Sequence, residues 1–262
     1  MFLARLLGEV FPQAEVHHEA PGSRQINILA NLNSAHLLPR SALFAWWRLR
    51  IGRSLARCSK PYYIDSNNYL FGLVAQQPYL YPQLRVIHLI RDPRTYVSSH
   101  LSWMQANQRS KIANHLIPFW QPNPFLVGEL SLGEYIALSR FEKYCWVWSY
   151  KNRVIQSLQA TEIPYLRVRF EELFDTPHSL ETLQRMFDFA ELPSNVEMQA
   201  GRFQQPVNAS GRARFSKWNT WEPEQCRRLD RFCQPLMEQY GYGCEPEWQA
   251  KLAILDPSKA RI

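Results

Sequence analysis

This 262-residue sequence lacks long apolar runs, zinc-type cysteine spacing and a recognisable secretory leader. No apolar run reaches the ~20 residues that a transmembrane helix needs, which argues against a membrane-spanning protein. The five cysteines are odd in number and show neither C-x-x-C nor Cys/His spacing, so no disulfide framework or zinc site is expected. Without a signal peptide, we expect a reducing compartment and a cytoplasmic location.

Glycine is also scarce, with ten residues in the whole chain, and none of them forms a phosphate-binding loop. Gly128 and Gly133 have the spacing of such a loop, but Glu134 and Tyr135 follow where lysine and serine or threonine are required. A nucleotide kinase is therefore strongly disfavoured. The carboxylates are not clustered as a magnesium site would need, so we expect no metal.

Positive charge exceeds negative charge, with 30 Lys and Arg residues against 23 Asp and Glu residues and a net charge of +7. This balance suits an anionic ligand, a nucleic acid or an acidic membrane surface, and it also fits an ordinary solvated surface. Nucleic-acid binding rests on charge alone, and we do not expect it. Residues 41–53 mix aromatic side chains with arginines, so they could lie on a membrane, although a packing helix with a basic outer face is favoured.

What is present is an apolar, aromatic-rich chain in which short strands alternate with helices. The alternation predicts one α/β domain over residues 1–262 with a parallel sheet. The last helix should carry Cys226 and Cys233 in the core. An irregular insert is expected at 105–133 on the substrate side, and a polar segment at 193–221. Strands are expected at 14–18, 62–65, 86–90 and 165–170, and helices at 1–11, 26–57 (divided near Pro39), 69–76, 133–160, 176–190 and 226–240.

Residues 85–100 form the stretch around which the chain is organised. The β-branched run Val86–Ile90 predicts a buried strand, and Asp92 and Pro93 are typical of the start of a helix. Arg91 then lies at the carboxyl end of the strand, where open α/β sheets bind ligands, beside a helix N-terminus that attracts anions. The stretch predicts a site for a phosphate-like group.

Arg91-Asp-Pro-Arg followed by Ser99 resembles the 3′-phosphate motif of sulfotransferases that use 3′-phosphoadenosine 5′-phosphosulfate (PAPS). In that family the arginine and the serine eight positions later hold the 3′-phosphate, which points to Arg91 and Ser99. Residues 168–177 resemble a second family segment, in which Phe170 stands where the family usually has a tyrosine that contacts adenosine.

Residues 206–218 are similar to a segment of tyrosylprotein sulfotransferases, in which a lysine helps to hold the cofactor phosphates. The resemblance assigns that role to Lys217, with Arg214 as a basic neighbour, and makes residues 193–221 a cofactor-covering region. It also implies a P-loop NTPase-like fold, in which a three-layer parallel sheet is flanked by helices.

The family begins with a strand and a P-loop-like turn that holds the 5′-phosphosulfate group. Phe2–Leu7 resembles the helix that follows this turn, so we expect that the first strand and the loop are missing from this sequence. A truncated sequence is the preferred explanation, and a natural degenerate member of the family is the alternative.

The resemblance also implies a catalytic base soon after the first helix. Glu19 matches its position in tyrosylprotein sulfotransferases, and His18 and His17 are candidates because histidine titrates near neutral pH. The function expected is sulfuryl transfer from PAPS to a hydroxyl or amine of a small-molecule, carbohydrate or phenolic acceptor. The alternative is a non-catalytic protein that binds adenosine bisphosphate or a partner.

Overall fold

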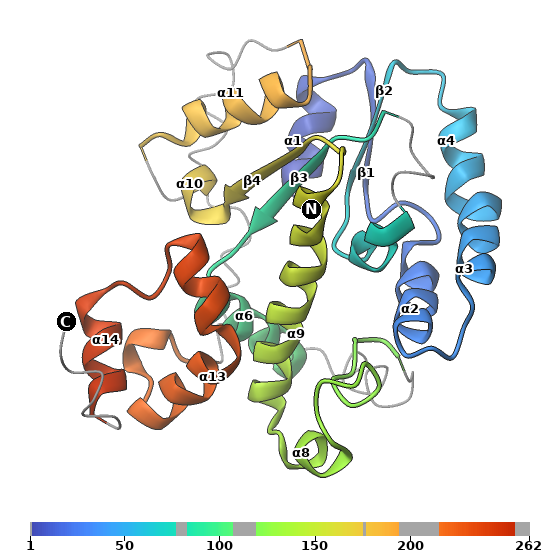
Figure 1. The fold of residues 1–262 in the computed structure, drawn as a ribbon. Helices are drawn as coiled ribbons and strands as arrows, with labels where there is room; N and C mark the ends of the chain where they lie inside the picture. Colours follow the sequence, from blue (N-terminus) through green and yellow to red (C-terminus); the bar gives the residue numbers. More distant parts are fainter. Residues whose placement is uncertain (1, 77–82, 107–118, 175–176, 194–214, 255–262) are drawn as a thin grey trace.

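The computed structural model describes residues 2–76, 83–106, 119–174, 177–193 and 215–254. Within these ranges, four short strands form two parallel pairs (Figure 1). β1 (Ala14–His18) pairs with β2 (Tyr62–Ser66), and β3 (Val86–Ile90) pairs with β4 (Tyr165–Arg169). The α/β class and the expected strand positions are confirmed.

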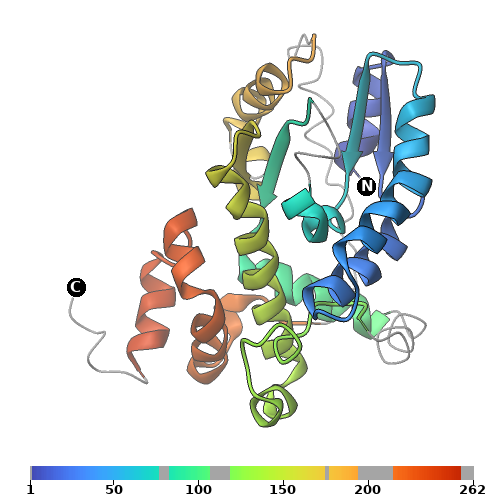
Figure 2. The same ribbon diagram turned by 45° about the vertical axis from the view of Figure 1, so that its right-hand side comes forward.

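The continuous three-layer sheet implied by the resemblance is not seen among the described strands. They form two separate two-stranded sheets, and Figure 2 shows β2 and β3 as the strands nearest to the other pair. An isolated pair of strands is marginally stable at best, so these sheets depend on the helices that pack against them.

One core cluster connects the two strand pairs. Leu7 and Phe11, at the end of α1 (Phe2–Val10), pack in it with Val168 of β4 and Phe187 of α11 (Ser179–Phe189). The rings of Phe11 and Phe187 meet edge to face with centroids 4.8 Å apart, an arrangement that aromatic pairs favour. Burial of these side chains therefore holds the two sheets in one body.

A second cluster lies among four helices below the β3–β4 pair in Figure 1. The side chains of Cys226 and Cys233 are fully buried in it, which confirms the prediction that they are core residues. The four helices are α6 (Pro93–Ala106), α9 (Arg140–Gln156), α13 (Pro223–Tyr240) and α14 (Pro246–Ala253).

The third cluster is built from the helices that follow β1. Leu43, Trp47 and Ile51 are buried in it, so residues 41–53 form a packing segment with an outer basic face. No helix in the described part of the chain is both long and apolar enough to cross a bilayer. The elements are α2 (Ser23–Ser34), α3 (Arg40–Trp47), the π-helix η1 (Arg48–Gly52), α4 (Arg53–Arg57) and the 3₁₀ helix η2 (Leu70–Gln76).

The single helix expected over residues 133–160 is wrong. The chain instead forms α8 (Leu132–Ala137), a break, α9 and the 3₁₀ helix η3 (Ser157–Ala160). The break arises because Ser139 caps α9 in a reciprocal capping box with Glu142. Apolar spacing continues across this point, so the periodicity alone hides the cap. Two further short helices are α10 (Phe170–Phe174) and the 3₁₀ helix η5 (Trp218–Thr220).

Residues 119–131 contain no helix or strand, as expected for the insert, and residues 107–118 lie outside the described part. The amide of Asn27 donates to the carbonyl of Trp120 at 2.7 Å, and that of Asn31 donates to the carbonyl of Phe119 at 2.7 Å. Both asparagines are on α2, so the insert is fastened to the β1–β2 side of the molecule.

Acid is expected to destabilise the fold through His88 on β3. Its Nε2 donates to Asn152 at 2.8 Å while its Nδ1 accepts from the Tyr165 hydroxyl, so the ring is held neutral. Burial lowers the pKa of His88 from 6.5 to about 4. The unfolded chain binds the proton first, so this stability is present above pH 6.5 and is lost as the pH falls.

From pH 7 to pH 5 this one group should remove about 2 kcal/mol from the free energy of unfolding. Urea denaturation at both pH values should therefore show that the free energy of unfolding falls less in His88→Gln than in the parent. His178→Gln is the control because the His178 side chain is exposed. An equal loss in the parent and in His88→Gln would contradict the role assigned to His88.

Candidate functional site

The junction between β3 and α6 forms as the sequence predicts. Pro93 is the first residue of α6, and Asp92 caps the helix because its Oδ1 accepts the backbone N–H of Arg94 at 2.8 Å. The backbone N–H of Asp92 itself donates to Oε1 of Glu171 at 3.0 Å. This bond ties the junction to the carboxyl end of the neighbouring strand β4.

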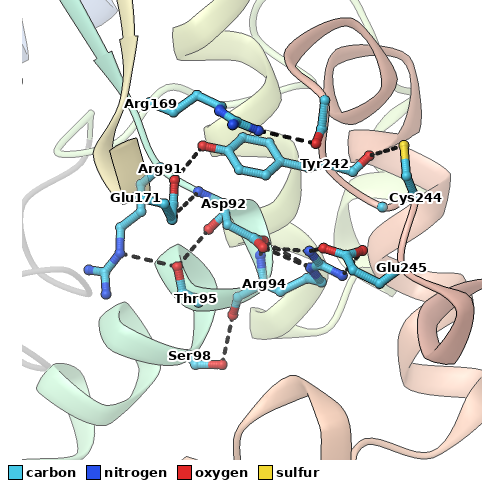
Figure 3. Close-up of polar contacts among 12 residues, drawn as sticks. Arg91, Asp92, Arg94, Thr95, Ser98, Arg169, Glu171, Tyr242, Cys244 and Glu245 are labelled. Atoms are coloured by element: carbon cyan, nitrogen blue, oxygen red, sulfur yellow. Dashed lines mark hydrogen bonds and ion pairs between the residues drawn. The ribbon is translucent and has the colours of Figure 1, made fainter. Parts of the chain in front are cut away.

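Arg91 follows directly on β3, and its side chain points away from the polar cluster around Asp92 (Figure 3). Its Nε donates to the hydroxyl of Thr95 at 3.1 Å, and its guanidinium lies 4.9 Å from the ring centroid of Phe170. The indole N–H of Trp148 donates a hydrogen bond to the backbone carbonyl of Arg91 at 2.9 Å. The two Nη groups make no hydrogen bond to the described residues and can serve as donors for an oxyanion.

Arg94 has a different role from Arg91, although both belong to the same motif. Its side chain is buried and forms ion pairs at 2.6 Å with Asp92 and with Glu245 (Figure 3). The guanidinium also lies over the rings of Trp218 and Trp248, at 4.3 and 5.1 Å from their centroids. Burial alone would lower the pKa of Arg94, but the two carboxylates outweigh it and raise the pKa. Arg94 therefore joins α6 to the C-terminal helices.

Phe170 begins α10, immediately after β4. Its ring is partly buried and packs at 4.4 Å from that of Phe174. The next residue, Glu171, accepts the hydroxyl of Tyr242 at 2.6 Å, in addition to the N–H of Asp92. Burial and the bond to Glu171 raise the pKa of Tyr242, so its hydroxyl stays protonated as the donor. These bonds bring Arg91 and Phe170 together, as the resemblance implies.

Ser99 and Lys217 are both exposed. Ser98 donates to the carbonyl of Ser216 at 3.4 Å, and the N–H of Phe215 donates to Ser102 at 3.1 Å. Residues 215–216 therefore run along α6 beside Ser98 and Ser102. Arg214 lies outside the described residues.

Glu19 lies immediately after β1, in a left-handed backbone conformation with φ of 58°. Its N–H donates to the carbonyl of Ser66, and its Oε1 accepts the amide of Asn68 at 3.2 Å. A non-glycine residue in this conformation is rare and, at the end of a strand, is a reason to suspect a functional role. The Nδ1 of His18 contacts the carbonyl of Ser66 at 3.0 Å.

The loop that carries Glu19 is braced by Asp65 and Asn67. Asp65 accepts the N–H of Ala20 at 3.3 Å and the amide of Asn67 at 2.9 Å, and Asn67 also donates to Ser23. Burial raises the pKa of Asp65. The conformation of Glu19 is therefore fixed from β2 and from the start of α2.

Lys151 on α9 is a charged residue of this region that the sequence does not single out. Its Nζ lies 4.8 Å from the ring centroid of Phe71, and burial lowers its pKa to about 8, against the opposing charge of Glu19. Burial, together with the charges of Lys151 and Arg91, lowers the pKa of His100 to about 4. Glu19, Lys151, His100 and Arg91 thus share one electrostatic neighbourhood.

A signal for Lys151 is present in the sequence. The apolar stripe of α9 includes Tyr144, Trp148 and Ile155, and a lysine stands where the next apolar residue would be expected. A charge at a core-facing position has to be paired or functional. Among the described residues, no group of three or more His, Cys, Asp and Glu side chains is arranged to hold a metal ion.

No protein-family model matches the chain. Carbohydrate sulfotransferase 2 of Mus musculus is similar to it, at 28% identity over 192 residues that cover 61% of this chain and 35% of the relative. Carbohydrate sulfotransferase 2 of Homo sapiens is similar at the same identity and coverage. The chain thus spans about a third of the length of the curated relatives it matches.

Proposed function

We propose that this chain, which is similar to carbohydrate sulfotransferase 2, is a sulfotransferase that transfers a sulfuryl group from PAPS to a hydroxyl group of a carbohydrate. The observation that carries the proposal is Arg91, whose guanidinium lies over Phe170 at a strand–helix junction with its Nη donors directed away from the protein's own carboxylates. That arrangement suits a ligand with a phosphate next to an aromatic base.

In this proposal the residues around α6 hold the nucleotide. Arg91 and Ser99 bind the 3′-phosphate, and Phe170 offers its ring to the adenine or ribose in place of the hydroxyl contact of a tyrosine. Lys217 contributes positive charge from the segment that runs along α6. The contribution of Arg214 stays a prediction. PAPS supplies the activated sulfuryl group.

Glu19 is proposed to accept the proton of the acceptor hydroxyl as its oxygen forms a bond to sulfur. The bond from sulfur to the bridging oxygen of the 5′-phosphate breaks, and adenosine 3′,5′-bisphosphate leaves. Lys151 lies close enough to Glu19 for their charges to interact, so its ammonium group adds positive charge beside the proposed base. Cationic groups also stabilise the charge that develops on the leaving phosphate.

We further propose that the strand and loop for the 5′-phosphosulfate group lie ahead of Met1. Among the described strands, β2 and β3 are edges of separate parallel sheets that lie beside each other (Figure 2). One more parallel strand between them would join the two sheets and pair both edges. In-frame coding sequence upstream of Met1 that encodes an apolar strand and a glycine-containing turn would support this arrangement, and a stop codon there would contradict it.

The function is tested by supplying radiolabelled PAPS and a panel of neutral carbohydrate, acidic carbohydrate and phenolic acceptors to the chain, extended by any in-frame upstream sequence. Transfer to a carbohydrate hydroxyl is expected. Glu19→Gln should lower kcat about 10²- to 10⁴-fold because it removes the general base, while the Kd for adenosine 3′,5′-bisphosphate stays within about two-fold.

His18→Gln is the matched variant, since His18 is the neighbouring candidate and its exposed ring contacts the backbone of Ser66. If His18→Gln loses the activity and Glu19→Gln keeps it, the base is His18. Nucleotide binding without transfer to any acceptor would overturn the enzyme assignment and favour a non-catalytic binding protein.

A further inference from the structure

A cavity of about 510 Å³ lies between the β1–α2 connection and the helical stretch α3–η1–α4. These elements are on the right of Figure 1. It is separate from the nucleotide site, because none of its lining residues belongs to β3, α6 or α10. The residues that matter for its chemistry are Glu15, Gly22, Trp46, Arg50, Arg53 and Arg57.

Three arginines line this cavity from one helical face. Arg50, Arg53 and Arg57 are spaced by three and four residues, which places their side chains on the same side of the η1–α4 stretch. Within the described part of the chain, Arg53 and Arg57 form no ion pair. Like charges gathered without carboxylate partners repel one another, so an anion between them would be stabilising.

Glu15 is the acidic residue among the described residues that line the cavity. Its carboxylate faces His17 and contacts the ring Nε2 at 2.8 Å. That hydrogen bond is the largest cause of its lowered pKa, and the arginines of the cavity are not among the causes. The lining therefore keeps an excess of positive charge.

Backbone features hold Arg50 in position. Gly22 has φ of 96°, and a Cβ built there would lie 3.2 Å from Cβ of Arg50, so the chain approaches the arginine where only glycine fits easily. The Arg50 guanidinium lies 5.1 Å from the ring centroid of Trp46. Arg50 also belongs to a π-helical turn, a feature often found at functional sites.

Trp46 adds an aromatic wall with a polar edge. Its ring lines the cavity and is partly buried, and its indole N–H is buried with no hydrogen-bond partner among the described residues. The guanidinium of Arg50 can donate two hydrogen bonds to an oxyanion, and the neighbouring ring of Trp46 can stack on a ring of the same ligand.

We propose that this cavity binds a sulfate or carboxylate group on the carbohydrate acceptor, so that the acceptor is an acidic saccharide. The proposal rests on the proposed function for the identity of the acceptor. Pro21 and Gly22 line the cavity and follow Glu19 by two and three residues, so the cavity lies close along the chain to the proposed base. The site is concave, which fits an oligosaccharide better than a flat membrane.

The test is calorimetric titration with a sulfated, uronate-containing tetrasaccharide and with its desulfated, carboxyl-reduced counterpart. The acidic probe should bind at least ten-fold more tightly than the neutral one, and its affinity should fall as salt is raised. The Arg53→Gln/Arg57→Gln double variant should weaken the acidic probe at least ten-fold. Its Kd for adenosine 3′,5′-bisphosphate should stay within about two-fold, because the nucleotide site is elsewhere.

The matched control is Arg227→Gln/Arg228→Gln, which removes two exposed arginines that pair with Glu224 on α13 and should leave saccharide binding unchanged. Equal binding of the two probes, or no effect of the cavity variant, would overturn the proposal. Cosedimentation with anionic phospholipid vesicles that depends on Arg53 and Arg57, without saccharide binding, would overturn it in favour of a membrane. If the parent chain binds the acidic probe but transfers no sulfuryl group to any acceptor, the enzyme assignment is refuted and the saccharide site is kept.

Discussion

Replacing Arg91 by alanine is expected to weaken binding of adenosine 3′,5′-bisphosphate by about 10- to 100-fold. A hydrogen bond to a charged group contributes about 1.5–3 kcal/mol, and a guanidinium on a phosphate offers two such bonds. The side chain also supports Phe170 from 4.9 Å, so its loss removes one wall of the nucleotide site. Isothermal titration calorimetry of the purified chain measures this change directly.

The control for Arg91→Ala is Arg227→Ala, which removes an equally charged, exposed arginine from α13. It should change the Kd by less than about two-fold, since a general loss of positive charge is a minor effect at physiological salt. The thermal midpoint of Arg91→Ala should stay close to that of the parent, because its Nη groups bond to none of the described residues. An unchanged Kd in this variant would contradict the 3′-phosphate assignment.

The position of Arg91 could be predicted from the sequence, whereas the role of Arg94 could not. A buried apolar strand followed by Asp-Pro has few possible geometries, so residue 91 has to lie at the strand end. Arg94 is three residues further on and looks equally basic. Its partners Glu245, Trp218 and Trp248 are more than 120 residues away in the chain, and their convergence depends on the packing of α6, α13 and α14.

The strands and most helices could be predicted because their apolar patterns are local. The break between α8 and α9 depends on a single cap at Ser139, which competes with an apolar period that continues across it. The division into two sheets depends on which strands meet, and pairing between distant strands leaves no local pattern.

The site residues that sequence reasoning missed are those whose environment is made by other elements. The apolar stripe of α9 marks Lys151 as unusual, but its neighbours Phe71 and Glu19 are set by the packing of α9 against other elements. Residues 41–53 are correctly predicted as a packing segment, but their arginines become a group only when the β1–α2 connection closes the cavity beside them. Local patterns predict which side chains are buried, and the tertiary fold decides which charges meet.

Replacing Arg94 by methionine is expected to lower the free energy of unfolding by about 3–5 kcal/mol, the range for removal of one partner from a buried ion pair. Asp92 would remain buried with its charge uncompensated, and Glu245 would lose the contact that lowers its pKa. Methionine keeps the apolar contact with Trp218 and Trp248, so the loss would reflect charge and hydrogen bonding more than volume.

Urea denaturation followed by tryptophan fluorescence measures this loss, with Arg91→Met as the matched control that should cost less than about 1 kcal/mol. The double variant Asp92→Asn/Arg94→Met should recover part of the stability, because asparagine retains the helix cap while it removes the stranded charge. This recovery also keeps the test decisive if Arg94→Met alone fails to fold. Equal losses in Arg91→Met and Arg94→Met would contradict the division of roles within the motif, in which one arginine holds the fold and the other faces the ligand.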